Sequence, residues 1–511
     1  MNGMTRYAVI VCTAAVLLSP LTRQCAADAP RPGVPGAPPV KPNVLLIILE
    51  DWGPYLGCYG QKMMHTPNLD RLAAEGCRYD ACFSSAPVCS SGRSSLMTGM
   101  SQYSVHGEQH RTADRDKKPL PAGVKSLPEL FRDAGYFTAL GCGYSKKIDL
   151  NFQFPTANIY LGDDWKQRKP GQPFFAHLTL IGTHRPWHSD PAWPIDPARI
   201  VLPPWYPDTP LTRKDWAMGL ESAQNSDRLM GEIIARLKRE GIYDDTAIVV
   251  TADHGVALPR AKQFLYDEGL HIPLIIRYPQ AGTRAGMKPG TSSTELVSNV
   301  DIVPTILGIA GLPAPRYLQG RNILAGTMYP WSASPPRKLI FAGRDKMDST
   351  HDAMRAVRSK DFKYILNLMP ERPYCQFNAY KESSYPGLAV LNVLHIEGKL
   401  PPEQDAFMQP CKPAEELYDL RKDPYEIHNL AKDPSCSDIL RSLRSDLDAW
   451  RKSVGDPGVS DEFRKGGWAA TYPTRSLDEW KQIESHWEEH ILRGGPRPKI
   501  AVPAGFGDDE P

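Results

Sequence analysis

The sequence predicts an α/β fold: a large, mainly parallel sheet sandwiched by helices, followed by a smaller antiparallel sheet with a helix packed on it. Through the first two-thirds of the 511 residues, apolar runs typical of buried parallel strands alternate with amphipathic helical segments. After about residue 336 this alternation gives way to two short strands around a turn. The length also suggests more than one domain, so we expect a large domain over residues 43–335 and a smaller one over 336–470.

The elements of the large domain follow one another along the chain. Residues 44–49 are an unbroken apolar run, which predicts a strand covered on both faces. A capping box from Ser126 to Glu129 marks a helix start, and apolar residues at helical spacing predict a long helix over residues 212–241. Further strands are expected at residues 136–140, 174–180, 247–251 and 272–276.

The smaller domain and the tail have a different pattern. Residues 354–357 and 362–366 flank a short turn and predict a hairpin. A helix is expected at about residues 437–454. The C-terminal tail, residues 471–511, is polar and rich in Gly and Pro at its end, so we expect it to be loosely ordered.

The first 27 residues have the pattern of a secretory signal peptide. Arg6 precedes an apolar run that ends at Leu18, and small residues suggest cleavage near Ala27. The run is short for a membrane span, although an uncleaved anchor is the alternative. We therefore expect an exported protein, periplasmic or secreted, with a Pro-rich linker at 28–42 and no membrane span after cleavage.

The composition excludes several classes of function. Lys and Arg number 60 against 58 Asp and Glu, a formal net charge of +2, so we expect no nucleic-acid partner. The 49 prolines are roughly twice the usual ~5% and favour many loops over a helical bundle. The ten cysteines are too sparse for a disulfide scaffold, although export would permit a pair between Cys375 and Cys411.

Polar residues follow three of the expected strands. Glu50 and Asp51 follow the first strand, His184 follows another, and Asp253 and His254 follow a third. In open α/β sheets ligands bind beyond the carboxyl ends of the strands, so these residues are expected to converge. Oxygen-rich clusters of this kind hold a hard divalent cation. Each pair taken alone could instead cap a turn, but three converging strand ends favour a site.

Cys89 lies where a helix is expected to start. A nucleophile at that position gains from the helix dipole and from free amide hydrogens, and Arg93 lies one turn further on the same face. A lone cysteine is more often buried packing or half of a disulfide, and Cys77 and Cys82 are near enough in the sequence to be partners. The polar residues around Cys89 favour the nucleophile.

These residues resemble a known family. Cys89-Ser-Ser-Gly-Arg93 followed by Leu96-Met-Thr-Gly99 is similar to the signature of the formylglycine-dependent type I sulfatases, Cys-x-Pro/Ala-x-Arg followed by Leu/Ile-x-Thr-Gly. The resemblance covers about residues 40–455 and includes residues 43–47, 65–76, 251–255, 354–365 and 416–430. Residues 50–60 and 255–273 look closest to a bacterial heparan N-sulfatase or sulfamidase-like branch.

The resemblance implies an alkaline-phosphatase-like fold and an exported sulfuric ester hydrolase. Its substrates would be sulfate esters or sulfamates, in particular of sulfated carbohydrate, as in an N-sulfoglucosamine sulfohydrolase. A maturation enzyme would oxidise Cys89 to formylglycine, whose hydrate attacks sulfur and then expels sulfate. Arg93 would orient this group, and His184 and Lys262 would contact the sulfate or protonate the leaving group.

The resemblance also implies a bound Ca²⁺. Its ligands would be Glu50, Asp51, Asp253 and His254, together with the oxygen derived from Cys89. The family more often has Asp at the first of these positions and Asn at the last. Because an imidazole is a softer ligand than an amide, Mn²⁺ or Zn²⁺ is the less favoured alternative.

Two further departures concern the signature and a lysine. Ser91 stands where the signature has Pro or Ala, which bears on recognition by the maturation enzyme. The family's Gly-Lys-x-His segment is absent, and residues 141–152 instead contain two adjacent lysines. We expect Lys146 to bind the sulfate, with Lys147 as the alternative. Both could equally be solvated loop residues.

Four other residues are candidates for binding the substrate. His110 and Arg111 are expected at the mouth of the pocket, and Arg344 and Asp345 are expected to reach a sugar from the smaller domain. The alternatives are exposed loop residues for the first pair and a surface salt bridge for the second.

Two other functions stay open at this point. The Asp253–His254 pair is compatible with a phosphodiester or phosphonate hydrolase of the same superfamily. Ser91 and the missing Lys-x-His segment are compatible with a carbohydrate-binding protein that has lost the chemistry. Comparing the turnover of an aryl phosphate with that of an aryl sulfate tests the first alternative, which predicts dominant phosphate turnover. Hydrolysis that depends on Cys89 excludes the second.

Overall fold

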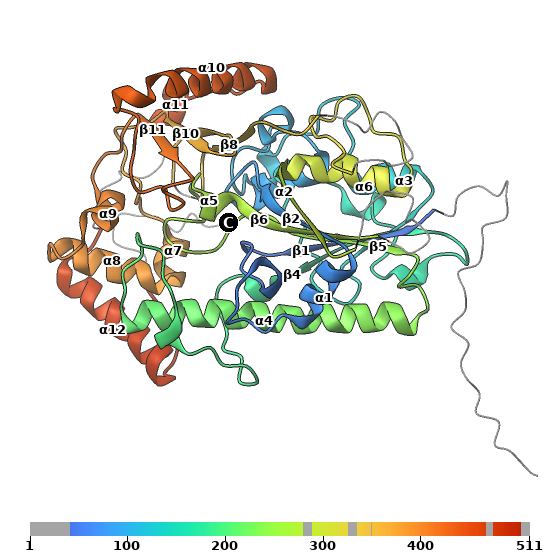
Figure 1. Ribbon diagram of the computed structural model, residues 1–511, viewed down its shortest axis with the longest axis horizontal. Coiled ribbons are helices and arrows are strands. Elements are labelled where there is room, and N and C mark those ends of the chain that lie inside the picture. The colour runs from blue at the N-terminus through green and yellow to red at the C-terminus, as the bar shows by residue number, and fades with distance from the viewer. Residues whose placement is uncertain (1–40, 279–288, 325–334, 349, 467–473, 502–511) are drawn as a thin grey trace, which may run out of the picture. The chain divides into compact units, whose positions relative to one another are not determined.

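A seven-stranded sheet forms the centre of the computed structural model, which describes residues 41–278, 289–324, 335–348, 350–466 and 474–501. The strand order is β3-β4-β1-β5-β6-β2-β7 (Figure 1). The strands are β1 Asn43–Leu49, β2 Cys77–Phe83, β3 Phe137–Leu140, β4 Phe174–Leu180, β5 Thr246–Ala252, β6 His271–Arg277 and β7 Thr291–Ser298. The expected signal peptide and most of the expected linker lie outside the described residues.

The direction of the strands confirms the expected mainly parallel sheet. Strand β1 pairs in parallel with β4 and β5, and β3 pairs in parallel with β4. Strand β6 runs antiparallel to both β5 and β2, while β2 and β7 are parallel. All seven residues of β1 are buried, as its unbroken apolar run predicts. The sequence did not lead us to expect β2 and β7.

Helices cover both faces of this sheet (Figure 1). Helices α1 (Pro67–Glu75) and α4 (Pro210–Arg239) lie on one face, and α2 (Cys89–Thr98), α3 (Leu127–Asp133) and α6 (Ile302–Ala310) lie on the other. The long helix α4 starts at a capping box formed by Thr209 and Thr212 and has Pro210 at its first position. A short helix, α5 (Asp267–Leu270), leads into β6.

A smaller antiparallel sheet has the order β11-β10-β9-β8. Its strands are β8 Ile340–Arg344, β9 Met354–Arg358, β10 Phe362–Asn367 and β11 Glu415–Asp419, and α10 (Ser437–Val454) packs on β9 and β10. The expected hairpin and helix are therefore confirmed. Residues 41–511 form one compact unit, so the division into domains at residue 335 stays a prediction.

The expectation of a loosely ordered tail is wrong for the residues that the structure describes there. Helix α12 (Leu477–Arg493) packs on α4 and on α8 (Pro386–Ile396). It buries Trp480, Ile483 and Trp487 on one face, and a capping box of Ser476 and Glu479 starts it. Other helices of this half are α7 (Ala379–Ser384), α9 (Pro402–Asp405) and α11 (Asp461–Lys465).

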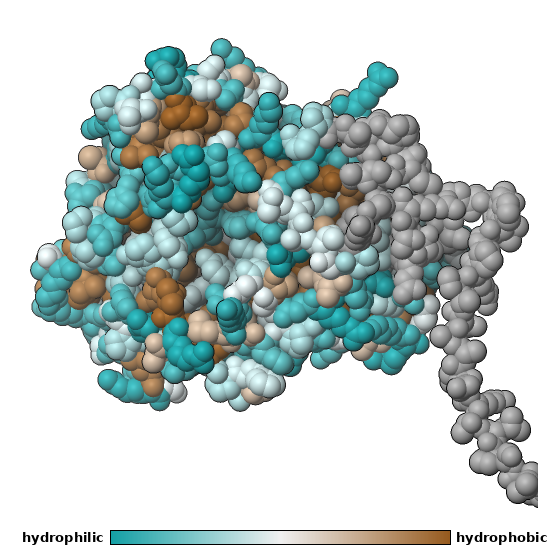
Figure 2. Space-filling model, viewed as in Figure 1, coloured by the Kyte–Doolittle hydropathy of each residue, from teal (hydrophilic) through white to brown (hydrophobic). Residues whose placement is uncertain are grey.

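The surface agrees with the balanced composition. On the face shown in Figure 2, hydrophilic residues predominate and hydrophobic residues form separate patches. In the part of the chain that the structure describes, no helix is both long and apolar enough to cross a membrane.

Candidate active site

Three adjacent strands bring the predicted polar residues together at one edge of the large sheet. Glu50 and Asp51 follow β1, and Asp253 and His254 follow β5, its parallel neighbour. The backbone amide of Asp51 donates to Asp253 Oδ1 at 2.9 Å, and so does the amide of His254 at 3.1 Å. His184 follows β4 on the other side of β1, after the short 3₁₀ turn η6 (Ile181–Thr183). The predicted convergence of strand ends is thus present.

Cys89 is the first residue of α2 and is fully enclosed, with 0% of its surface exposed. Its Sγ lies 3.4 Å from Asp51 Oδ1, 3.4 Å from His254 Nε2 and 3.5 Å from Lys262 Nζ. No disulfide forms among the cysteines that the structure describes, and Cys375 and Cys411 are both free. The residue expected to be the nucleophile therefore lies against the acidic strand ends rather than in a disulfide.

Gly92 allows α2 to approach the end of β5 this closely. A Cβ atom at position 92 would lie 2.6 Å from the carbonyl oxygen of Asp253 and 3.1 Å from Ser84 Oγ. Real side chains do not tolerate such a contact with backbone, so any larger residue would push the helix away. The close packing of helix backbone on loop backbone sets the distance between Cys89 and Asp253.

Arg93 joins two of the predicted acidic residues from behind. Its Nη2 lies 2.6 Å from Glu50 Oε2, and its Nε lies 3.0 Å from Asp253 Oδ2. Its Nη1 donates to Thr179 Oγ1 at 3.1 Å. All three charged side chains are completely buried. Such an arrangement holds the carboxylates in fixed positions, because one oxygen of each is tied to the planar guanidinium.

The two adjacent lysines are placed in the opposite way to our first expectation. Lys147 Nζ lies 2.5 Å from Glu50 Oε1 and 3.5 Å from Asp149 Oδ2. The side chain of Lys146 is 59% exposed and pairs with Asp163 at 3.1 Å. The choice of Lys146 as the sulfate-binding lysine is therefore wrong in geometry, and the alternative, Lys147, lies in the site.

The side chains of Asp51, Cys89, Asp253 and His254 could hold a cation, since one ligand atom from each lies within 4.8 Å of the others. Nδ1 of His254 lies 2.9 Å from the carbonyl oxygen of Gly255, so it must carry a hydrogen. Nε2 then presents its lone pair to Asp51 Oδ1, 2.9 Å away. Two acceptors this close require a proton or a metal ion between them, and this tautomer is typical of a ligating histidine. The donor set therefore fits a divalent cation.

Glu50 contributes less directly to that set than expected. Its carboxylate is bound on one side by Arg93 and on the other by Lys147. It groups instead with Asp51 and His184, whose ligand atoms also lie within 4.8 Å of one another. Glu50 thus lies beside the four-residue group, and its carboxylate forms ion pairs with the side chains of Arg93 and Lys147.

Lys262 and His184 face the same carboxylate. Lys262 Nζ lies 2.5 Å from Asp51 Oδ2, and His184 Nε2 lies 3.7 Å from that oxygen. Tyr380, which the sequence reasoning missed, has its hydroxyl 3.4 Å from His184 Nε2, and its ring lies under Lys262 Nζ at 5.0 Å. No sequence pattern marks Tyr380, because it lies on α7, almost 200 residues further along the chain.

Electrostatics at this edge favour ionised carboxylates and a protonated lysine. Burial alone would raise the pKa of Asp51, but the charge of Lys262 holds it well below its usual value. Burial alone would lower the pKa of Lys262, but Asp51 raises it. Burial and the charge of Asp51 raise the pKa of the Cys89 thiol, so an unmodified Cys89 is a poor nucleophile here.

His110 and Arg111 lie next to the residue that follows Cys89. Ser90 Oγ lies 2.8 Å from His110 Nδ1, and the amide of Arg111 donates to Ser90 Oγ at 3.2 Å. His110 is buried, with its Nε2 3.4 Å from Asp348 Oδ1, and burial lowers its pKa to about 4. The side chain of Arg111 is exposed. Arg111 thus fits the expected position at a pocket mouth, and His110 is a neutral internal residue.

Arg344 and Asp345 do not reach a substrate. Both side chains are buried. Asp345 accepts a hydrogen bond from the hydroxyl of Tyr103 at 2.7 Å and pairs with Arg355 at 3.0 Å. The expectation of sugar binding, and the alternative of a surface salt bridge, are both wrong, because β8 turns these residues into the interior.

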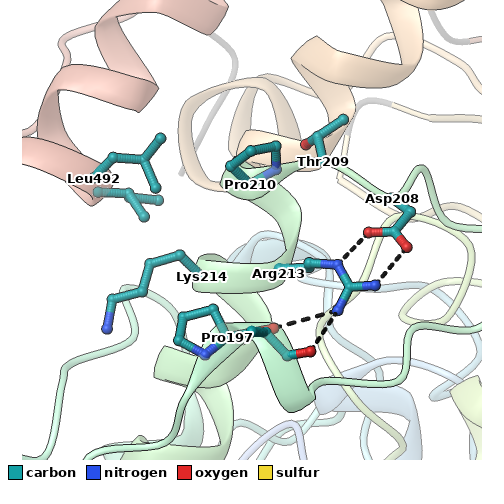
Figure 3. Close-up of a pocket in the computed structure, with 9 residues that line it drawn as sticks. Pro197, Asp208, Thr209, Pro210, Arg213, Lys214 and Leu492 are labelled. Carbon is teal, nitrogen blue, oxygen red and sulfur yellow. Dashed lines mark hydrogen bonds and ion pairs between the residues drawn. The ribbon is translucent and has the colours of Figure 1, made fainter.

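A wide cavity elsewhere is lined by none of these residues. It has a volume of about 650 Å³ and lies between the start of α4, the 3₁₀ turn η7 (Pro197–Arg199) and α12. Figure 3 shows Arg213 bonded to Asp208 on one side of this cavity, with Leu492 on the other side. It contains neither a nucleophile nor a group of metal ligands, so it is not the candidate active site.

The fold belongs to the alkaline-phosphatase-like class, and its site combines an enclosed cysteine at a helix start with a group of cation ligands at the edge of the sheet. The sequence comparisons narrow this class. Residues 42–165 and 144–312 match the family model Sulfatase, and residues 258–369 match N-sulphoglucosamine sulphohydrolase, C-terminal. The chain belongs to the sulfatase family and is a hydrolase of sulfate esters or sulfamates.

Several known proteins are similar to this chain. An ulvan-active sulfatase of Formosa agariphila is 32% identical over 470 residues, which cover 82% of this chain and 76% of that protein. Human N-sulphoglucosamine sulphohydrolase is 27% identical over 473 residues, covering 82% and 91%.

Solved structures share the fold at low identity. One, in complex with its substrate D-glucosamine-2-N,6-O-disulfate, has a TM-score of 0.56 at 19% identity and covers 83% of this chain and all of the other. The phosphonate monoester hydrolase of Agrobacterium radiobacter has a TM-score of 0.58 at 18% identity and covers 84% of this chain and all of the other. These likenesses confirm the expected alkaline-phosphatase-like fold.

Proposed function

We propose that the protein is an exported sulfatase that hydrolyses sulfate esters or sulfamates of a sulfated carbohydrate, using a Cys89-derived formylglycine and a bound divalent cation. The placement of Cys89 carries the proposal. Its Sγ lies within 3.5 Å of a carboxylate, an imidazole and an ammonium group. An oxidised Cys89 supplies a hydrated aldehyde, which offers an oxygen nucleophile where the thiol is a poor one.

Arg93 and Lys147 keep the acidic side of the site in place. Arg93 ties Glu50 to Asp253 from behind and therefore positions the strand ends without touching a substrate. Lys147 is 24% exposed and holds the other oxygen of Glu50, so its ammonium group can bind a sulfate oxygen on the open side.

Lys262, His184 and Arg111 serve the substrate side. Lys262 lies between Asp51 and Cys89 Sγ, where it binds negative charge that develops on a reacting sulfate. His184 is a quarter exposed and lies where it can exchange a proton with the atom that leaves sulfur, and burial lowers its pKa below the usual value. Arg111 lies further out and binds an anionic or hydroxyl group of the sugar.

Asp51, Asp253 and His254 would hold the cation, together with the oxygen that replaces Cys89 Sγ. The cation supplies Lewis acidity, polarising a sulfate oxygen and lowering the pKa of the nucleophile. Two carboxylates favour Ca²⁺, and the imidazole leaves Mn²⁺ or Zn²⁺ as the less favoured choices.

The relatives support a sulfated carbohydrate as the substrate. The two curated relatives are named for ulvan and for N-sulphoglucosamine. Export rests on the signal-peptide pattern of residues 1–27, and it would give the enzyme access to extracellular polysaccharide. A maturation enzyme that converts Cys89 is the one protein partner this function requires.

Mass spectrometry of peptides from the native host tests the modification. The Cys89 peptide is expected to show the mass loss of a thiol converted to an aldehyde, whereas the Cys82 peptide from the same digest keeps its thiol. Cys82 is an equally buried control. An unmodified Cys89 in an active preparation contradicts the proposal.

Desulfation of a panel of sulfated mono- and disaccharides identifies the bond that is cleaved. The panel pairs N-sulfated glucosamine with its 6-O-sulfated isomer and adds a sulfated ulvan fragment. An aryl sulfate and an aryl phosphonate are assayed against each other in the same preparation. Because His254 stands where the family often has Asn, a phosphonate hydrolase is the second candidate, and dominant phosphonate turnover would replace the first.

A further inference from the structure

A small cavity lies beside the loop that carries Lys262. Its wall includes Pro259, Gln263 and Phe264 from that loop, Arg344 from β8 and Lys381 from α7. The cavity has a volume of about 10 Å³, which is room for about one water molecule. Neither a sulfate nor a sugar fits in it.

Two buried cations line this cavity with hydrogen-bond donors to spare. Arg344 is 1% exposed, and among the described residues its Nε and Nη1 have no hydrogen-bond partner. Lys381 is 6% exposed and donates to the carbonyl oxygens of Pro259 at 3.0 Å and Lys262 at 2.9 Å. An ammonium group has three hydrogens, so one of those on Lys381 remains. Buried donors without partners are costly and call for a ligand.

The neighbouring acidic groups do not balance these charges. Asp352 Oδ2 lies 4.0 Å from Arg344 Nη1, beyond hydrogen-bond distance, while Asp352 Oδ1 is bound by Lys412 at 3.0 Å. Among the described residues, ion pairs thus join both Arg344 and Lys412 to the single carboxylate of Asp352, and no ion pair joins Lys381 to an acidic residue. An unbalanced positive charge in the interior is unfavourable without an anion.

The other carboxylates nearby are bound elsewhere. Asp345 is held by Tyr103 and Arg355. Asp348 is paired with His110 at 3.4 Å and accepts from Gln263 and Asn378, both at 3.1 Å. Neither carboxylate forms an ion pair with Arg344 or Lys381, although the charge of Asp345 acts on Arg344 and that of Asp348 acts on Lys381.

The remaining wall residues add little compensation. The ring of Phe264 lies 4.7 Å from both the Arg344 guanidinium and Lys381 Nζ, which offers two cation–π contacts but no negative charge. The Gln376 amide donates to the carbonyl oxygen of Pro373, and the Thr350 hydroxyl donates to that of Phe377. What the cavity lacks is a compact acceptor between the two cations.

We propose that this cavity binds a monatomic anion, chloride, between Arg344 and Lys381. Chloride is close to a water molecule in size and accepts from the unpartnered Nε and Nη1 of Arg344 and from the remaining ammonium hydrogen of Lys381. Burial, with Arg344 next, lowers the pKa of Lys381 well below its usual value, and a bound anion would oppose that effect. The anion would stabilise the loop between Pro259 and Lys262, because Lys381 already bonds to both ends of it.

Thermal unfolding of the full-length protein tests the site. We compare chloride and bromide with gluconate, an anion too large for the cavity, at equal ionic strength. Because the anion binds only the folded state, Tm is expected to rise by about 2 °C or more in either halide. The rise should level off as the halide concentration increases. Arg344→Met and Lys381→Met are expected to abolish the difference between halide and gluconate, and Lys360→Met, an exposed control, to retain it.

Crystals grown in bromide provide the second test and need no variant. An anomalous peak is expected in the cavity, within hydrogen-bonding reach of both cations. If the variants do not fold, this map decides. A cavity that shows only water in bromide overturns the proposal, and so does a halide effect on Tm that persists unchanged in folded Arg344→Met and Lys381→Met proteins.

Discussion

Two clusters of buried charge use the same kinds of residue for different purposes. The interface cluster, which we define as Asp267, Arg358, Lys363 and Glu426, joins α5 to the small sheet. Lys363 Nζ lies 2.6 Å from Asp267 Oδ1 and 2.7 Å from Glu426 Oε1, and Arg358 Nη2 lies 2.9 Å from Asp267 Oδ2. Two cations and two carboxylates thus balance one another in a closed arrangement.

The catalytic cluster, which we define as Asp51, Cys89, Asp253, His254 and Lys262, lacks that balance. Its acceptors face one another, as His254 Nε2 and Asp51 Oδ1 do at 2.9 Å, and Cys89 lies between carboxylate and ammonium groups. The difference shows that buried charge alone does not mark a functional site. In a functional site, some charged or hydrogen-bonding side chains do not satisfy one another and therefore require a ligand.

The largest expected effect is on turnover and comes from the catalytic cluster. Cys89→Ala removes the nucleophile and is expected to lower kcat at least about 10⁴-fold, as losses of nucleophiles in other hydrolases do. Desulfation assays with matched thermal unfolding measure this. Tm should change little, because the cavity left by one sulfur atom is small. Retained turnover would show that the chemistry does not pass through Cys89.

The interface cluster is expected to respond in stability instead. Lys363→Met leaves Glu426 without its cation in the interior and is expected to lower the free energy of unfolding by about 3–5 kcal/mol. Urea unfolding measures this, with Lys360→Met as an exposed control that should stay within about 0.5 kcal/mol of the native value. Native kcat at low temperature should survive. A loss of kcat in folded Lys363→Met would mean that the two clusters are coupled.

The adjacent residues Lys146 and Lys147 allow a partly buried and an exposed charge to be compared within one loop. Lys147→Met removes a cation beside Glu50 and is expected to lower kcat/KM about 10²–10³-fold. Lys146→Met removes an exposed cation paired with Asp163 and is expected to stay within about twofold of native, since surface pairs are worth little. Steady-state kinetics on one sulfated substrate compares them. The reverse order would restore the expectation from the sequence.

The most gradual of the expected effects is a pH slope in stability from a third buried group. Burial raises the pKa of Asp345 to about 7, well above its value of about 3.9 in an unfolded chain. The folded state therefore holds a proton that the unfolded state releases, and stability falls as pH rises between those two values. The slope is about 1 kcal/mol per pH unit. Asp345→Asn is expected to remove that slope in urea unfolding measured from pH 4.5 to 8, and an unchanged slope would assign it to another group.

The sequence was sufficient for the elements with strong local patterns. The strand β1 and the helix α4 were predicted because their apolar periodicity is long and unbroken. Strand β2 was missed because Arg78 and Asp80 interrupt its apolar residues and pair with each other on its surface. Helix α12 had a detectable signal, since the Ser476–Glu479 capping box precedes Trp480, Ile483 and Trp487 at helical spacing.

The site residues that directly follow strands were predictable from the sequence. Those whose placement depends on tertiary contacts were not. Asp51 and Asp253 were found because neighbouring parallel strands end together. The choice between Lys146 and Lys147 depended on which way one loop residue turns, and no local pattern encodes that. Arg344 and Asp345 look exposed by residue type, but their partners Asp352 and Arg355 follow only through the pairing of β8 with β9.

The contact at Gly92 has a mechanical consequence. Most packed elements are separated by a layer of side chains that can rearrange when pressure or temperature changes. Here helix backbone lies against loop backbone, with no space for even a Cβ atom. The spacing between Cys89 and Asp253 is therefore set by a nearly incompressible stop, so the nucleophile and its neighbouring carboxylate should keep their separation while the rest of the fold expands or contracts.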